Sequence, residues 1–235
     1  MAARVPVWQP VLRSEELLRR VALALLVGSA LMAGAGCEDP SLRFNQMGTQ
    51  YYRAGDYTLA RAAFEEAINV NPDVGEYYYN RGMCEQALGH FDAAIHNYDM
   101  ATQLAPHIVA AFGNQARCYM EKKDPDKAYA ALVAGTTANP YTGEAFINVG
   151  RFLLSRGDTA GAKLWLAKAW AMDPENPRAH LEYANLCLRL GERDEAVEHL
   201  RKSLELAPAQ PAVSARLSEI APTGTQLPPP KQQNK

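Results

Sequence analysis

Proline recurs at a constant interval of 34 residues through the middle of the chain, at Pro72, Pro106, Pro140, Pro174 and Pro208. Alanine follows the same interval, at Ala60, Ala94, Ala128, Ala162 and Ala196. Self-similarity at a fixed period of this length is typical of repeat proteins, in which each unit packs mainly on its neighbours. The interval therefore predicts five copies of one structural unit within residues 41–210.

Each unit reads as a pair of helices. In residues 41–74 the small and apolar side chains fall at helical spacing on both sides of Ala54-Gly55-Asp56, and Pro72 closes the copy. Glycine accepts the left-handed conformation at a helix end, and proline stops a helix because it lacks an amide hydrogen. We therefore predict an all-α fold, an α-solenoid of five helical hairpins. Their ranges are 41–74, 75–108, 109–142, 143–176 and 177–210.

The segments after the last hairpin have different compositions. Residues 211–220 place Val213, Leu217 and Ile220 at spacings of four and three, which predicts a helix that caps the exposed apolar face of the array. Residues 221–235 are rich in proline, glutamine and lysine and have few apolar side chains, so a disordered tail is expected there.

The amino-terminal segment carries an apolar run. Residues 21–36 are uncharged, follow Arg19-Arg20 and directly precede Cys37. A helix of this length extends about 24 Å, less than the ~30 Å hydrocarbon core of a bilayer. Small residues at 33–36 suit cleavage by a signal peptidase. We interpret residues 1–36 as a leader and residues 37–40 as a short polar tether.

The cysteine after these small residues resembles the lipobox of bacterial lipoproteins. That resemblance implies acylation of Cys37 and a membrane-anchored chain on the periplasmic or extracytoplasmic face of the bacterial cell envelope. Gly34 stands where leucine is commonest in this motif, and Leu31 lies three residues before it. Two alternatives are an exposed thiol after an ordinary cleaved signal, and a leader retained as an anchor.

The spacing within the hairpins resembles that of the tetratricopeptide repeat, with small residues at positions 8, 20 and 27 and proline at position 32 of each copy. The resemblance covers residues 41–210 and implies a superhelix whose first helices line a concave groove for a peptide or another protein. Transferred position by position, it assigns the binding residues Tyr79, Asn80, Met83, Asn114, Arg117, Met120, Asn148 and Arg151.

These residues indicate a protein ligand. An asparagine amide both donates and accepts hydrogen bonds, so Asn80, Asn114 and Asn148 could hold the backbone of an extended segment. Together with Arg117 and Arg151 they resemble part of the carboxylate clamp of some tetratricopeptide adaptors, although the expected central lysine is absent. The whole groove carries arginines and glutamates together. The alternative is that the asparagines serve helix-to-helix hydrogen bonds.

Composition argues against several other functions. The formal charge of −2 lacks the basic excess of a general nucleic-acid binder. None of the four cysteines lies in a CxxC pair, and the five histidines are scattered without an HExxH pattern, so we expect no metal site and no cofactor. No catalytic constellation is evident either, and we expect neither enzymatic activity nor a small-molecule substrate.

Our leading hypothesis is a membrane-tethered lipoprotein scaffold that binds a protein segment and supports assembly of an envelope complex. One alternative is an accessory subunit that presents substrate to a separate envelope enzyme. The other is a membrane-anchored cochaperone.

Overall fold

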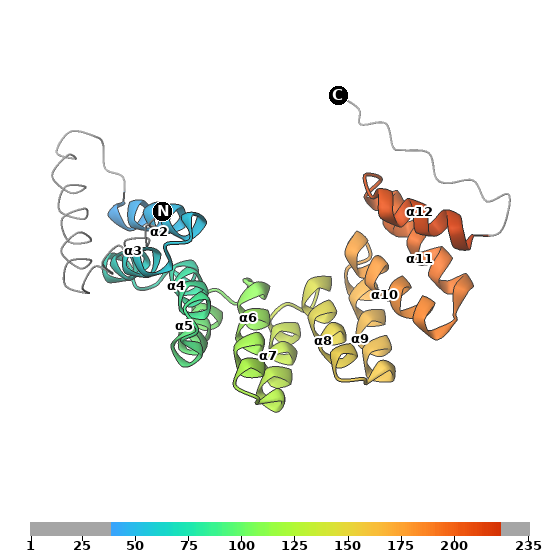
Figure 1. The fold of residues 1–235 in the computed structure, drawn as a ribbon, viewed down its shortest axis with the longest axis horizontal. Helices are drawn as coiled ribbons and strands as arrows, with labels where there is room; N and C mark the ends of the chain where they lie inside the picture. Colours follow the sequence, from blue (N-terminus) through green and yellow to red (C-terminus); the bar gives the residue numbers. More distant parts are fainter. Residues whose placement is uncertain (1–38, 222–235) are drawn as a thin grey trace, which may run out of the picture. The chain divides into compact units, whose positions relative to one another are not determined.

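A computed structural model describes residues 39–221, and these form eleven α-helices without a β-strand (Figure 1). This described part of the chain is all-α, as the sequence predicts. The predicted leader, Cys37 and the tail from residue 222 lie outside the described residues. The chain divides into two compact units, Met1–Asp73 and Val74–Lys235, which we describe one at a time.

The described part of the first unit is a single hairpin of α2 (Pro40–Ala54) and α3 (Tyr57–Val70). The helix α2 begins at Pro40, one residue earlier than predicted, since Pro40 was expected in the tether. Proline is compatible with the first turn of a helix. Asp39 caps α2 by accepting a hydrogen bond from the Ser41 amide over 2.9 Å. The two helices approach closely at Gly48, where an added Cβ would lie 2.6 Å from the ring of Phe64.

The second unit contains four hairpins and one further helix. They are α4 (Gly75–Ala87), α5 (Phe91–Leu104), α6 (Val109–Glu121), α7 (Pro125–Ala138), α8 (Gly143–Ser155), α9 (Thr159–Met172), α10 (Pro177–Leu190), α11 (Arg193–Leu206) and α12 (Pro211–Ile220). The second helix of every hairpin ends two residues before its proline. Successive hairpins stack through α5 on α6, α7 on α8 and α9 on α10, and the first helices also contact one another in order. This arrangement is an α-solenoid.

Small residues bring the two helices of a hairpin together. An added Cβ at Gly82 would meet the Tyr98 ring at 2.8 Å, and one at Gly150 would meet Leu166 at 2.7 Å. Tyr98 is fully buried, and its hydroxyl donates to the Gln86 side chain over 2.8 Å. The pairing of small and large side chains thus sets the helix spacing at each contact.

The cysteines Cys84, Cys118 and Cys187 all lie in the core with no exposed surface. Burial is the largest cause that raises the pKa of Cys118, to about 11. The Cys118 thiol therefore remains protonated at neutral pH, and all three buried cysteines serve as packing groups.

The turn inside a hairpin requires a left-handed residue. Gly55, Gly89, Gly157 and Gly191 have φ between 80° and 84°. The third hairpin has Lys123 at the equivalent place, with φ 59°. A residue with a Cβ is strained in this conformation, so the third turn is less favourable than the other four.

The helix α12 covers the end of the array. Its Val213 and Leu217 are buried in the same core cluster as Leu200 and Leu204 of α11. The Arg193 guanidinium of α11 donates to the carbonyl oxygen of Ile220 over 2.9 Å and so satisfies the carboxyl end of α12.

Candidate binding groove

A cavity of about 550 Å³ opens between α6 and α8, within the second unit. Its lining comprises Ala110, Gly113, Asn114, Ala116, Arg117, Met120, Leu132, Glu144, Asn148, Arg151, Phe152 and Ser155. We call it the α6–α8 groove. Five of the eight binding residues assigned from the sequence line it: Asn114, Arg117, Met120, Asn148 and Arg151.

Helical periodicity gathers these side chains. Asn114 and Arg117 are three residues apart on α6, and Asn148 and Arg151 have the same spacing on α8, so each pair lies on one helix face. Because α6 and α8 contact one another, the two pairs face a common space. The third and fourth hairpins therefore present matched sets of one amide and one guanidinium.

The other three assigned residues belong to α4 and do not line this cavity. Tyr79 adjoins it, because the Asn114 amide donates to the Tyr79 hydroxyl at the long distance of 3.5 Å. Burial raises the pKa of Tyr79, so its hydroxyl stays protonated at neutral pH. Asn80 and Met83 are partly buried on α4.

Small side chains on α6 make the hollow. Ala110, Gly113 and Ala116 leave space along the wall, and an added Cβ at Gly113 would meet the Asn148 amide nitrogen at an ordinary 3.5 Å. Leu132 of α7 and Phe152 of α8 supply apolar surface. Neither Leu132 nor Phe152 was predicted from the sequence to line the site. The signal available for the hollow itself was the small residues at 110 and 113, on the same helix face as Asn114 and Arg117.

Ion pairing changes the charge that the groove presents. Arg178 of α10 donates to Glu144 over 2.8 Å and lies 3.9 Å from Glu182, so one arginine faces two carboxylates. Within residues 39–221, the side chains of Arg117 and Arg151 form neither an ion pair nor a hydrogen bond, and both residues are exposed. The groove thus has a local excess of positive donors, although a count over all first helices gives a mixed charge.

The chemistry of this lining suits an extended polypeptide. Two amides can pair with backbone groups, two guanidiniums can bind a carboxylate in a bidentate manner, and Met120, Leu132 and Phe152 can contact apolar side chains.

One other cluster has the composition of a metal site. Ligand atoms of Cys187, Glu192 and Glu195 lie within 4.8 Å of one another. The ammonium of Lys163 already binds this place, donating to Glu192 over 2.6 Å and to Glu195 over 3.3 Å. Burial, as the largest cause, raises the pKa of Cys187 to about 12, so no thiolate is available at neutral pH. The cluster is an interhelical ion pair that ties α9 to α11.

The histidines are less scattered than their positions in the sequence indicate. His180 of α10 and His199 of α11 lie with their Nδ1 atoms 2.9 Å apart, at a second cavity that opens on α11.

Across residues 39–221, no helix is both long enough and apolar enough to cross a bilayer.

Family models match three segments of the chain, residues 45–85, 75–108 and 153–220, and all three describe the tetratricopeptide repeat. The chain contains tetratricopeptide repeats. The groove helix α6 and most of α8 lie between the matched segments, and the 34-residue spacing and hairpin stacking relate them to the flanking tetratricopeptide repeats.

Known proteins resemble this chain in sequence or in fold. The human DnaJ homolog subfamily C member 7 is 28% identical over 85 residues, which is 34% of this chain but only 17% of that protein. A tetratricopeptide protein of Thermus thermophilus is 23% identical and superposes with a TM-score of 0.55 over 77% of this chain and 98% of its own. The structure of PilW, described as a widely conserved type IV pilus biogenesis factor, has 20% identity and a TM-score of 0.56 over 78% of this chain and 87% of its own.

Proposed function

We propose that this chain is a non-enzymatic scaffold whose α6–α8 groove binds an extended protein segment that carries a carboxylate. The observation that supports the proposal best is the matched arrangement of Asn114 with Arg117 and Asn148 with Arg151 along one open cavity. An interaction role also agrees with the tetratricopeptide fold, which presents helix faces to a protein partner.

The charges favour an acidic anchor in the bound segment. Arg178 neutralises Glu144 at the edge of the groove, so the guanidiniums of Arg117 and Arg151 dominate its local field. A carboxylate between them would form charge-assisted hydrogen bonds, while the two asparagines pair with the backbone. Ser155 adds a further hydroxyl at the end of α8.

We further propose that the scaffold is anchored in the bacterial envelope through a lipid on Cys37 and supports assembly of an envelope complex. The apolar run before Cys37 supports the anchor. The role in assembly extends to this chain what is said of PilW, a pilus biogenesis factor of the same fold. Stable residence at the membrane needs more than one acyl chain, because a single chain binds only marginally.

Site-specific crosslinking tests the groove. A photoreactive residue at position 120 should capture a partner in cells, whereas one at Leu164, exposed on α9, should not capture the same partner. The substitutions Arg117→Ala and Arg151→Ala should abolish capture without lowering the melting temperature appreciably, since both side chains are exposed. Equal capture at both positions, or capture unaffected by the arginine substitutions, would contradict the proposal.

The anchor is tested separately. Cys37→Ser should release the protein from the membrane fraction and prevent incorporation of labelled fatty acid. Incorporation that persists in Cys37→Ser, or a wild-type protein that never takes up label, would remove the lipid from the proposal and leave groove binding untouched.

A further inference from the structure

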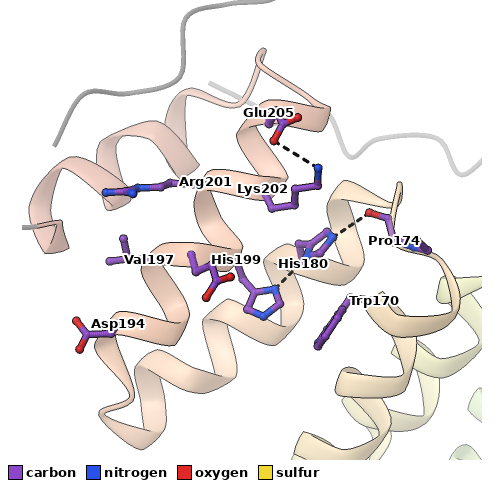
Figure 2. Close-up of a pocket in the computed structure, with 10 residues that line it drawn as sticks. Trp170, Pro174, His180, Asp194, Val197, His199, Arg201, Lys202 and Glu205 are labelled. Atoms are coloured by element: carbon purple, nitrogen blue, oxygen red, sulfur yellow. Dashed lines mark hydrogen bonds and ion pairs between the residues drawn. The ribbon is translucent and has the colours of Figure 1, made fainter.

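A second cavity of about 840 Å³ lies along α11, with Trp170 of α9 and His180 of α10 on one side (Figure 2). Its lining also includes Pro174, Asp194, Val197, Glu198, His199, Arg201, Lys202 and Glu205. Figure 2 shows that His199 points from α11 toward His180, with the Trp170 ring beside the pair. None of these residues belongs to the α6–α8 groove.

The two imidazoles meet head-on. Their Nδ1 atoms are 2.9 Å apart and their ring centres are 5.2 Å apart. The separation of the ring centres nearly equals the Nδ1–Nδ1 distance plus the short distance from each Nδ1 to its own ring centre. Both Nδ1 atoms therefore lie near the line that joins the ring centres. Lone pairs that bind one metal ion converge on a third point instead of facing each other. The geometry is that of a hydrogen bond with one proton between the rings.

The protein backbone sets the tautomer. The Nε2 atom of His180 lies 3.0 Å from the carbonyl oxygen of Pro174. A carbonyl only accepts, so this nitrogen carries a hydrogen and the Nδ1 of neutral His180 is an acceptor. His199 must then donate from its own Nδ1. A relay of two hydrogen bonds therefore links α11 through α10 to the loop that follows α9.

Aromatic side chains shield this relay. His180 is 5% exposed and stacks on Trp170 with an angle of 24° between the planes. The ring of Tyr183 meets His199 edge-on with 4.7 Å between centres. Among residues 39–221 the Trp170 Nε1 hydrogen has no acceptor, so Trp170 contributes a donor and not an acceptor beside the pair.

Charged groups approach the pair from each packed helix. Burial and, next, the neighbouring His180 lower the pKa of His199. Glu198 and Glu195 of α11 act in the opposite direction but are the smaller effects. Glu195 is itself held by the Tyr183 hydroxyl of α10 at 2.7 Å and by Lys163 of α9 at 3.3 Å. Lys202 and Glu205 form an ion pair at the cavity over 3.4 Å. Asp194 and Arg201, which lie on either side of His199 in the sequence of α11, also line the cavity.

We propose that the His180–His199 pair is a proton-operated latch that holds α10 and α11 of the last hairpin together at neutral pH and releases them from one another in mild acid. One added proton can reside on the Nε2 of His199. It leaves the shared hydrogen bond intact but places a charge among aromatic rings, which already weakens the folded hairpin. A second proton must enter the space between the two Nδ1 atoms, where two N–H groups would face each other. The shared bond is then lost and the two cations repel.

The direction of the pH effect follows from proton binding. The pKa of His199 is lower in the folded chain than in the unfolded chain, where an imidazole titrates near ~6.5. The unfolded state thus binds more protons between those two values. The stabilisation of the last hairpin is complete above about pH 6.5 and is lost as the pH falls toward the folded pKa.

Hydrogen exchange and imidazole NMR on the full chain test the latch. After correction for intrinsic exchange, amides of α10 and α11 should open more often at about pH 5 than at about pH 7.5. The increase should be about tenfold for each unit by which the pKa of His199 in the folded chain lies below its pKa in the unfolded chain. His199→Asn supplies an amide donor near the position of Nδ1 and does not titrate, so it should remove most of this acid response. His96→Asn removes an exposed histidine of α5 and is the matched control, with an unchanged response.

Two results would overturn the proposal. One is acid-induced opening in His199→Asn equal to that of the wild type. The other is a wild-type His199 imidazole that titrates together with the exposed His96, or whose nitrogen shifts show no proton on Nδ1 at neutral pH. The wild-type titration decides the matter if His199→Asn does not fold.

Discussion

Arg178 on α10 donates a hydrogen bond to Glu144 on α8 over 2.8 Å and so removes a negative charge from the edge of the α6–α8 groove. The two residues are 34 positions apart, one repeat length. An arginine of the fifth repeat therefore adjusts the field of a groove that the third and fourth repeats build.

Breaking this pair should weaken groove binding. In Arg178→Gln the Glu144 carboxylate is left on the same helix face as Asn148 and Arg151, where it repels an acidic ligand. We expect a loss of about 1 kcal/mol, since the groups are partly exposed. Calorimetric titration of the segment identified by crosslinking measures it. Adding Glu144→Gln to Arg178→Gln should restore affinity; failure to restore it would show that Arg178 acts in another way.

Two glycines of the same fold should respond to alanine in opposite ways. Gly150→Ala places a Cβ 2.7 Å from Leu166 at the α8–α9 contact and should destabilise by roughly 1–3 kcal/mol through overpacking. Gly113→Ala meets only the Asn148 amide, at 3.5 Å, and should stabilise α6 by up to about 1 kcal/mol. Urea unfolding compares the two. Because the new methyl group narrows the groove, Gly113→Ala should also reduce ligand affinity.

The third turn can be improved. Lys123 holds a left-handed conformation with φ 59°, where the four equivalent turns have glycine. Lys123→Gly should stabilise the chain by about 1 kcal/mol, because it removes the clash of the Cβ with the backbone. The reciprocal change, Gly157→Lys, should destabilise by a similar amount. Thermal melts of both variants measure this, and a fall in melting temperature for Lys123→Gly would contradict the strain.

The helix α12 should protect the last repeat. Leu217 is fully buried in the core cluster that it shares with Leu200 and Leu204 of α11, so Leu217→Ala should cost roughly 2–5 kcal/mol. The adjacent Arg216 is exposed, and Arg216→Ala should change stability by less than about 0.5 kcal/mol. Hydrogen exchange should show α11 opening more often in the first variant and unchanged in the second. Uniform loss of protection from α4 to α11 would argue against a local capping role.

Much of the fold is readable from local spacing. The recurrence of Ala60 and Pro72 at 34-residue intervals reports contacts between helices that are neighbours in the chain, so the sequence carries them directly. The burial of Cys84 and Cys118 could be predicted for the same reason, because both stand beside a small-residue contact.

The site was predictable only in part. The face of α6 that carries Asn114 and Arg117 follows from helical periodicity, and five of the eight assigned side chains line one cavity. The apolar surface from Leu132 and Phe152 and the neutralisation of Glu144 were not foreseen. Both the apolar lining and the ion pair depend on how closely neighbouring helices pack.

The sequence by itself determined the all-α hairpin architecture, its 34-residue period and the residue types on the first-helix faces, since these depend on spacing along one helix or between adjacent helices. Only the tertiary structure decided which side chains meet across the stack. His180 and His199 lie within hydrogen-bond distance because the α10–α11 hairpin brings them face to face, and His180 also contacts the Pro174 carbonyl. Such contacts depend on rotamers and packing at a particular helix crossing, which periodicity does not specify.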